Sequence, residues 1–283
     1  MITKLEITIL VNNFVSKSGF RGEHGLSLLL DVGEEGLNSR ILWDTGQTAE
    51  TLLFNLGLLN NALEGLNTVV ISHGHYDHTG GLLGLLECCS NPLKIMASSY
   101  AWGHRFNNRT ELKNIGSDLT PELIKNKGGD LIEVSEPVDI MDNVIVSGPI
   151  EKKEVCETNT SFLRIYDKDM EVDRFEDDMS LVVNLGPEGL FIITGCCHSG
   201  IINTVNHCRK FTGVRKVKGI VGGLHLLNAA PEKMIATRDF LKDLECDLIA
   251  PIHCSGLPET CYLRNELGDS VKFLGSGETI KVV

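Results

Sequence analysis

The segment SHGHYDHTGG, residues 72–81, constrains this chain more than any other feature. It places His73, His75, Asp77 and His78 directly after an apolar run and follows them with two glycines. Imidazole nitrogen and carboxylate oxygen are the ligand types that suit zinc, iron or manganese at neutral pH. Because a bound metal explains why several such ligands are placed together, the spacing favours a metal site over solvated turn residues.

The segment is long enough to serve two metal ions. If the chain leaves a strand and turns into a helix at Thr79, His73 and His75 can point one way while Asp77 and His78 point to a second position. The two following glycines would let the backbone turn tightly beneath these ligands, because glycine has no Cβ to crowd a metal.

A histidine follows an apolar strand-like run four times along the chain. The four runs are TVVISH, FIITGCCH, GIVGGLH and LIAPIH, and they end in His73, His198, His225 and His253. Buried strands often present functional side chains at their ends, where loops hold polar groups on a rigid base. The pattern therefore predicts one site built from four strand ends.

The remaining periodicity indicates an α/β chain. Strand-like runs occupy residues 4–11, 26–32, 40–43 and 68–72, and helical spacing occupies residues 48–59, 82–89, 201–210 and 231–244. The segment from about residue 100 to 178 is more polar and less periodic. We expect a single domain over residues 1–283, with a substrate-covering elaboration at about 100–178.

Charge and composition limit the classes of partner that this chain is expected to bind. A formal net charge of −12 argues against a broad surface that binds nucleic acid, so a small anionic molecule is the expected partner. No apolar run has the length of a membrane span or a signal peptide, which predicts a cytoplasmic protein with no membrane partner. Nine cysteines, an odd number, favour reduced thiols. The oligomeric state stays open.

The H-x-H-x-D-H signature followed by glycine resembles that of the metallo-β-lactamase superfamily, and Asp44 in LWDTG is similar to its earlier aspartate. This resemblance implies an αββα sandwich, in which two mixed β-sheets stack face to face with helices outside and metals at one edge. More narrowly, EHGLSLLL, TGCCHSGI, GGLHL and PIHCSG resemble the branch named for dihydropterin-ribofuranosylaminobenzene phosphate synthase. The chain departs from that branch in GPIEKK and in DDM, where the branch carries G-x-I-P-R-like and D-D-Q stretches.

The resemblance also implies a ligand set. His73 and His75 match the ligands of a first metal, Asp77 and His78 those of a second, and His253 the late histidine of the superfamily. Two divalent ions are therefore expected, with zinc as the first candidate and manganese or iron as alternatives.

Three positions leave alternatives open. Cys196 stands at the position of the superfamily's bridging aspartate. It is either a softer thiolate ligand or a small buried residue at a strand end. His198 would then supply the ligand that a missing midway histidine normally gives. Asp178 is a second candidate for that ligand, unless Asp177 and Asp178 form a solvated acidic turn.

Other residues are expected near the metals. His225 resembles a histidine of phosphodiesterase members, where it would donate a proton to a leaving oxygen, or it caps a buried turn. His24 in GEHGLS is expected to face the pocket. Asp44 is expected to accept hydrogen bonds from the metal-bearing loop and orient its ligands, although a turn aspartate would explain the same letters. His104 and His207 lack a motif.

Three classes of function remain. The first is a dinuclear metal hydrolase of a small-molecule phosphoester, ester or lactone, which would use metal-bound hydroxide. The second is a transferase that joins a dihydropterin diphosphate to a ribofuranosylaminobenzene phosphate. The third is an iron-site redox or sensing protein with Cys196 as a ligand. An anionic substrate would need positive charge near the metals. Four residues of the middle segment are candidates by location alone, and the alternative is that they are solvated charges on a loop: Arg105, Arg109, Lys152 and Lys153.

Overall fold

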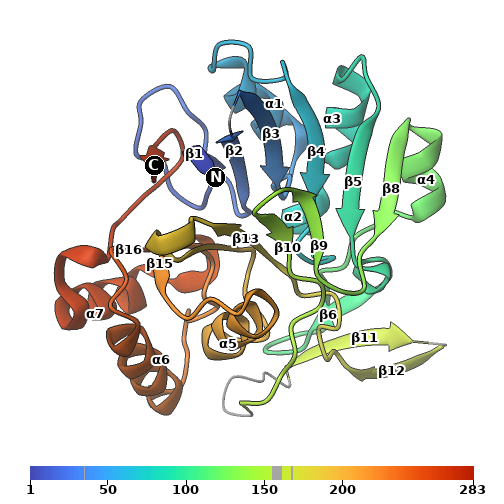
Figure 1. The fold of residues 1–283 in the computed structure, drawn as a ribbon. Helices are drawn as coiled ribbons and strands as arrows, with labels where there is room; N and C mark the ends of the chain where they lie inside the picture. The colour runs from blue at the N-terminus through green and yellow to red at the C-terminus, as the bar shows by residue number, and fades with distance from the viewer. Residues whose placement is uncertain (35, 155–160, 167) are drawn as a thin grey trace. The chain divides into compact units, whose positions relative to one another are not determined.

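The computed structural model describes residues 1–34, 36–154, 161–166 and 168–283 (Figure 1). These residues form two compact units. The amino-terminal unit comprises Thr3–Ser135, Asn159–Asp177 and Gly275–Val283, and the carboxyl-terminal unit comprises Met1–Ile2, Glu136–Thr158 and Asp178–Leu274. Each unit has its own mixed sheet and its own apolar core.

The amino-terminal unit is built on a seven-stranded sheet in the order β17-β1-β2-β3-β4-β5-β8. Its strands are β1 (Ile2–Val11), β2 (Ser27–Glu34), β3 (Leu37–Trp43), β4 (Leu66–Val70), β5 (Leu93–Ala97), β8 (Gly129–Glu133) and β17 (Thr279–Lys281). Strand β2 pairs with β3 in antiparallel fashion, whereas β3, β4, β5 and β8 run parallel. Parallel strands end at the same sheet edge, so the loops after them gather there.

Helices cover this sheet through one apolar cluster. They are α1 (Ala49–Gly57), α3 (Leu82–Cys88) and α4 (Pro121–Asn126). Leu52 of α1, Leu85 of α3 and Ile124 of α4 pack in the same buried cluster as Leu42 and Ile95 of the sheet. Thr48 caps α1 by accepting a hydrogen bond from Thr51 N, which satisfies one of the free amides of the first turn.

A small second sheet completes the amino-terminal unit. Its order is β12-β11-β6-β7, and its strands are β6 (Arg105–Asn107), β7 (Lys113–Asn114), β11 (Phe162–Tyr166) and β12 (Asp169–Val172). Two short helical turns belong to the same unit, α2 (Tyr76–Thr79) and the 3-10 turn η1 (Ser99–Ala101). Phe162 of β11 packs with Phe175 and Ile115 in a small apolar cluster, beside Tyr76 of α2.

The carboxyl-terminal unit has a six-stranded sheet in the order β16-β15-β14-β13-β10-β9. Its strands are β9 (Val138–Met141), β10 (Val144–Val146), β13 (Ser180–Asn184), β14 (Leu190–Thr194), β15 (Val217–Gly222) and β16 (Leu248–Pro251). Strands β13 and β14 form an antiparallel pair around η3 (Gly186–Glu188), and β14, β15 and β16 run parallel. Three parallel strand ends therefore lie next to one another.

One apolar cluster joins this sheet to three helices, α5 (Ile201–Thr212), α6 (Pro231–Leu244) and α7 (Leu257–Leu267). Val205, Leu241 and Leu263, one from each helix, pack there with Ile220 and Ile249 of the sheet. The 3-10 turns η4 (His253–Ser255) and η5 (Gly268–Ser270) flank α7.

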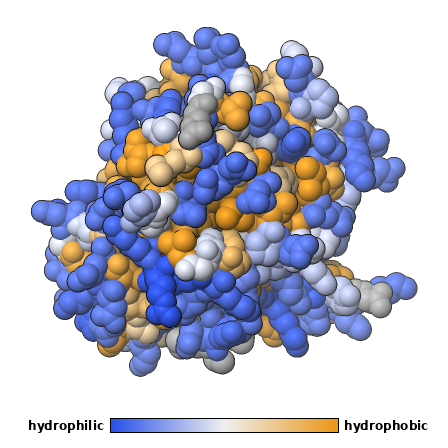
Figure 2. Space-filling model, viewed as in Figure 1, coloured by the Kyte–Doolittle hydropathy of each residue, from blue (hydrophilic) through white to orange (hydrophobic). Residues whose placement is uncertain are grey.

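The elements expected from periodicity are present, with ends shifted by a few residues. The polar segment at about 100–178 contributes β8 to one sheet, β9 and β10 to the other, and all of the four-stranded sheet. Its substrate-covering role and the single domain stay predictions. None of the described helices is long and apolar enough to cross a membrane. The face in Figure 2 is largely hydrophilic, with apolar residues in smaller patches.

Candidate metal centre

The segment after β4 carries the first set of candidate ligands. His73 lies three residues beyond the end of β4, His75 caps the short helix α2, and Asp77 and His78 lie within α2. All four side chains are buried. The chain therefore turns from strand to helix here, but α2 begins at Tyr76 and ends at Thr79, the residue at which the sequence predicted that the helix would begin.

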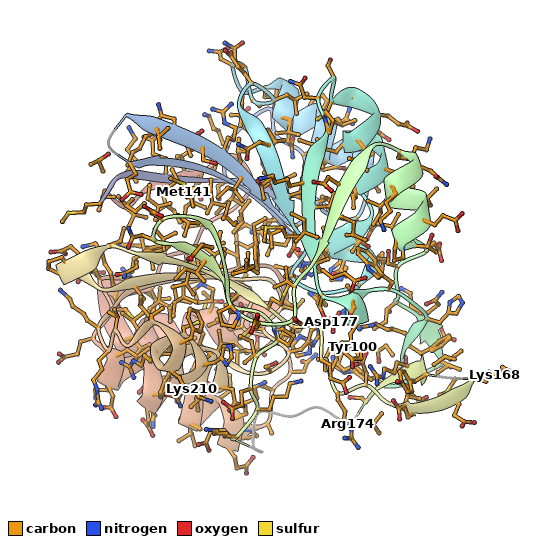
Figure 3. The ribbon with its side chains drawn as sticks, turned by 45° about the vertical axis from the view of Figure 1, so that its right-hand side comes forward. Tyr100, Met141, Lys168, Arg174, Asp177 and Lys210 are labelled. Carbon is orange, nitrogen blue, oxygen red and sulfur yellow. The ribbon has the colours of Figure 1, made fainter. Side chains whose placement is uncertain are left out.

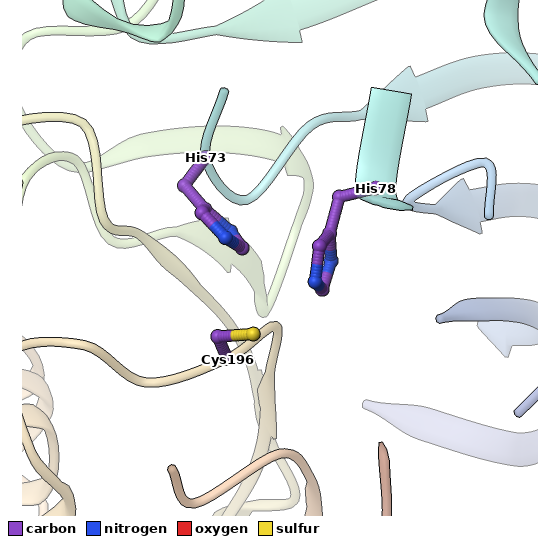
Figure 4. Close-up of side chains that lie close together, drawn as sticks. All are labelled: His73, His78 and Cys196. Carbon is purple, nitrogen blue, oxygen red and sulfur yellow. The ribbon is translucent and has the colours of Figure 1, made fainter. Parts of the chain in front are cut away.

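The imidazole rings of this segment converge. His73 Nε2 lies 3.0 Å from His75 Nδ1, a distance that suits a hydrogen bond or two ligands of one ion. The ring of His73 also packs beside that of His78, with centroids 4.2 Å apart (Figure 4). Since zinc–nitrogen bonds are about 2.0–2.1 Å long, His73 Nε2 and His75 Nδ1 are close enough to bind the same ion.

Asp44 directly follows β3 and holds the histidine segment by hydrogen bonds. Its backbone lies in the left-handed region, with a φ of 57°. Its Oδ1 accepts a hydrogen bond from Ser72 N at 2.7 Å, and its Oδ2 accepts from Ser72 Oγ at 2.7 Å and from His78 Nδ1 at 2.6 Å. Because Ser72 Oγ donates to Asp44, its lone pair accepts the proton of His73 Nδ1, 2.9 Å away. Nε2 of both His73 and His78 is thus left as a lone-pair donor for a metal.

Asp77 Oδ2 marks a second position. It lies 3.7 Å from His78 Nε2 and 3.1 Å from His24 Nε2. The side chain of His24 is 53% exposed, so this position is open to solvent on one side. His24, which its motif predicted to face the pocket, lies at the carboxylate of Asp77.

Burial sets the protonation of the central histidine. Desolvation lowers the pKa of His73 well below its usual value, and the neighbouring imidazoles of His78 and His75 lower it further. His73 is therefore neutral at pH 7, the form in which imidazole binds metals.

A buried cluster of charged side chains also binds the backbone of this histidine segment. Gly74 N donates to Asp177 Oδ2 at 2.7 Å, and Arg105 Nη1 lies 2.9 Å from the same oxygen and 3.5 Å from Asp173 Oδ2. Arg105 Nη2 also donates to Tyr100 O at 2.6 Å, so Arg105 links Tyr100 and Asp177, both labelled in Figure 3. Burial alone would lower the pKa of Arg105, but Asp177 and Asp173 outweigh it and raise that pKa.

This cluster corrects two expectations. Arg105 is 2% exposed and Asp177 is fully buried, so neither is a solvated loop charge, and Arg105 is engaged with carboxylates rather than aimed at a substrate. Gly74 is a further constrained position, which no feature of the sequence had marked. A Cβ there would lie 1.6 Å from Ala101 O, so only glycine allows η1 to pass this close to the histidines.

The second set of candidates follows the parallel strands of the carboxyl-terminal unit. Cys196 and His198 follow β14, His225 follows β15, and His253 begins η4 after β16. His225 and His253 adopt left-handed backbone conformations, with φ of 48° and 53°. Non-glycine residues in this region store strain and gather at functional sites. The rings of His198 and His225 lie 4.4 Å apart.

Two thiols and one imidazole form a compact group in this unit. Cys196, His225 and Cys254 each place one donor atom within 4.8 Å of the other two. Desolvation would raise the pKa of Cys254, but the contact with Cys196 and the positive potential of His253 and His225 leave it well below its usual value. Cys196 and His225 were candidates from the sequence, whereas Cys254 was not.

Asp178 is a buried hydrogen-bond acceptor. Its Oδ2 accepts a hydrogen bond from Ser199 N at 2.7 Å, and its side chain is 1% exposed. The alternative of a solvated acidic turn is therefore wrong for both aspartates of the DDM motif. Asp177 holds the histidine segment of its unit, and Asp178 holds the segment after β14 in the other unit. A role for Asp178 as a metal ligand stays a prediction.

The donor set fits the metals that the sequence predicts. Histidine and carboxylate donors suit borderline divalent ions, and the thiol of Cys196 adds a softer donor. Asp44 and Ser72 orient the two imidazoles in the way that such partners orient metal ligands. His104, by contrast, is exposed on the loop before β6.

Comparisons with known proteins agree with this chemistry. A family model described as "Metallo-beta-lactamase superfamily" matches residues 22–154. Over 99% of this chain and 97% of the relative, the chain is 30% identical to a protein of Methanocaldococcus jannaschii named 7,8-dihydropterin-6-methyl-4-(beta-D-ribofuranosyl)-aminobenzene-5'-phosphate synthase. An uncharacterized protein of the same organism is 35% identical over 88% of this chain and 90% of its own length.

The chain belongs to the metallo-beta-lactamase superfamily. A solved structure described as a metal-dependent hydrolase of the beta-lactamase superfamily has a TM-score of 0.82 and 27% identity, covering 98% of this chain and 99% of its own. A solved structure of unliganded yeast PDE1 has a TM-score of 0.55 at 15% identity and covers 97% of this chain and 99% of its own, which shows the fold alone. The mixed sheets and flanking helices of both units are those of the metallo-beta-lactamase fold.

Proposed function

We propose that this protein is a metal-dependent hydrolase of a small anionic phosphoester, ester or lactone. The observation that carries the proposal is the convergence of His73 Nε2 and His75 Nδ1 at 3.0 Å, beside His78, whose Nδ1 is held by Asp44 Oδ2 at 2.6 Å. A buried arrangement that points several unprotonated nitrogens inward suits a metal better than it suits a packed core.

We further propose that the two sets of ligands serve one pair of ions. His73, His75 and His198 would hold one ion, and Asp77, His78 and His253 the other, with Cys196 in the place of a bridging ligand. The family assignment supports this arrangement, since the superfamily is metal-dependent. Two ions bound in this way would lower the pKa of water and polarise a phosphoryl or carbonyl oxygen.

The protein's own groups would orient the ligand imidazoles and protonate the leaving oxygen. Asp44 keeps His78 in one tautomer, and Ser72 does the same for His73. His225, only partly buried at the end of β15, is proposed to give a proton to the leaving oxygen.

An anionic substrate requires positive charge, and Arg109 is the candidate that the structure favours. It is exposed, and its guanidinium lies 5.3 Å from the ring centre of Phe162, which also packs 5.9 Å from His75. Arg105 is engaged by two carboxylates. The Nζ of Lys153 lies 3.4 Å from Glu151, which reduces its attraction for an anion.

The decisive experiment is a panel of chromogenic phosphodiester, phosphomonoester, lactone and β-lactam substrates with zinc-, manganese- or iron-reconstituted protein. We expect turnover of at least one class, and we expect Asp77→Ala to lower kcat/KM by at least about a hundredfold because it removes a ligand. Asp118→Ala is the matched control, since Asp118 is exposed on a loop of the same unit. Equal loss in both variants, or no metal in the protein as purified, would refute the proposal.

The relative named as a synthase favours a second candidate, a transferase that condenses a dihydropterin diphosphate with a ribofuranosylaminobenzene phosphate. It supports this candidate because the similarity spans 99% of the chain. Release of inorganic diphosphate from that substrate pair, with dependence on both partners, would identify the transferase. Diphosphate release that needs only the pterin would instead indicate hydrolysis.

A further inference from the structure

Three neighbouring strand ends of the carboxyl-terminal unit bring two thiols and an imidazole together. Cys196 lies two residues after β14, and His225 and Cys254 lie three residues after β15 and β16. These strands are adjacent and parallel, so their ends share one edge. One donor atom of each residue lies within 4.8 Å of the other two.

The backbone around this group is built to admit the second thiol. A Cβ on Gly223 would lie 2.6 Å from Cys254 Sγ and 2.5 Å from Gly195 O, so glycine alone leaves the space that the sulfur occupies. Cys254 Sγ lies 3.5 Å from Cys196 O, which holds it toward β14. His225 reaches the group from a left-handed backbone conformation, a strained geometry of the kind that clusters at functional sites.

We propose that Cys196, His225 and Cys254 bind a thiophilic metal ion, in a soft site at the ends of β14, β15 and β16. Two sulfurs and one nitrogen form a donor set that prefers zinc, cadmium or copper(I) over magnesium or calcium, and the same set occurs in catalytic zinc sites. The ion would be held by two thiolates, so any thiol that is still protonated releases its proton to solvent, and the two negative charges balance a divalent ion.

The consequence of occupancy rests on the proposed function. His225 is the proposed proton donor of the reaction, and Cys196 is a proposed ligand of the catalytic ions. An ion held by both would withdraw them from catalysis, so cadmium is expected to inhibit through Cys254, which has no part in the proposed reaction.

The test uses Co²⁺ alone, because a cobalt–thiolate bond gives an ultraviolet charge-transfer band that imidazole and carboxylate ligands do not give. In a His73→Ala/His75→Ala background, which removes two of the competing imidazoles, the band is expected to persist. Adding Cys254→Ser, Cys196→Ser or His225→Ala should weaken cobalt affinity at least about tenfold. Cys261→Ser, at an exposed cysteine of α7, is the matched control and should leave the titration unchanged. A missing band in the folded background protein, or one that survives Cys254→Ser unaltered, would overturn the site.

A second measurement uses the natural sequence. One equivalent of Cd²⁺ is expected to slow alkylation of Cys254 by N-ethylmaleimide at least about tenfold, as read by peptide mass spectrometry, and to leave Cys261 unprotected. Unprotected Cys254 would contradict the proposal even if the variants fail to fold. Neither readout needs enzyme turnover. The soft metal site can therefore be refuted while the hydrolase proposal is supported, and the hydrolase proposal can be refuted while the soft site is supported.

Discussion

At the scale of single residues, the metal-binding segment is defined by its supporting partners as much as by its ligands. Asp44 accepts from Ser72 and His78, and Asp177 accepts from the amide of Gly74 between His73 and His75. Each of these carboxylates is buried, so each must be compensated by hydrogen bonds or an opposite charge. Their loss should therefore reduce stability as well as metal binding.

Asp177→Ala is predicted to lower the free energy of unfolding by about 3 kcal/mol, because it leaves Arg105 buried with only Asp173. It should also weaken metal binding about tenfold or more through the released amide of Gly74. Urea denaturation and metal titration measure the two effects. Glu171→Ala is the control, since the pair of Arg164 with Glu171 is partly exposed and should contribute less than about 1 kcal/mol. Equal destabilisation by both substitutions would contradict the assigned role.

At the scale of elements, short turns position the chemistry while long strands and helices provide the support. The histidine segment runs from β4 into α2 and is crossed by η1 at Gly74. The carboxyl-terminal unit places its candidates in the turns after β14, β15 and β16. Parallel strands explain both cases, since their carboxyl ends lie at one edge and carry side chains outward on short loops.

Gly74→Ala tests how closely two such elements approach. The added methyl group would overlap Ala101 O, so η1 must shift, and we expect a loss of about 1–3 kcal/mol or more together with weaker metal binding. Gly57→Ala is the matched control, because a Cβ there meets no atom within 4 Å and lies at the end of α1. It should be neutral or stabilising by up to about 1 kcal/mol. Thermal unfolding of both variants decides, and a stable, metal-loaded Gly74→Ala protein would refute the steric argument.

At the scale of the whole molecule, each unit repeats one plan: a mixed sheet with helices packed on an apolar cluster and candidate ligands beyond parallel strands. The described cysteines include buried residues of the apolar core and exposed residues of the surface. Cys208 and Cys246 are buried in the core of the carboxyl-terminal unit, whereas Cys88 and Cys261 are exposed. The described cysteines are all free thiols, in line with the expectation of reduced cysteines.

Native alkylation with iodoacetamide at pH 8 should label Cys88 and Cys261 well before Cys208 and Cys246. Burial raises the pKa of Cys246 to about 12 and raises that of Cys208 as well, so their reactive thiolates are scarce at pH 8. Raising the pH increases the thiolate fraction, but full labelling of the buried pair should require unfolding. Peptide mass spectrometry before and after denaturation measures the order. Early labelling of Cys208 would show that the core of this unit opens in the native state.

The sequence by itself determined the local features: the strand and helix periods, the ligand-rich segment at residues 72–81 and the histidines beyond apolar runs. Each of these depends on neighbours along the chain, where periodicity and spacing are sufficient. Only the tertiary structure decided which distant groups support them. The bond from Gly74 to Asp177 joins residues 103 positions apart, and the approach of Cys254 to Cys196 spans 58. Such contacts result from strand order and packing, because no local spacing encodes which strand ends become neighbours.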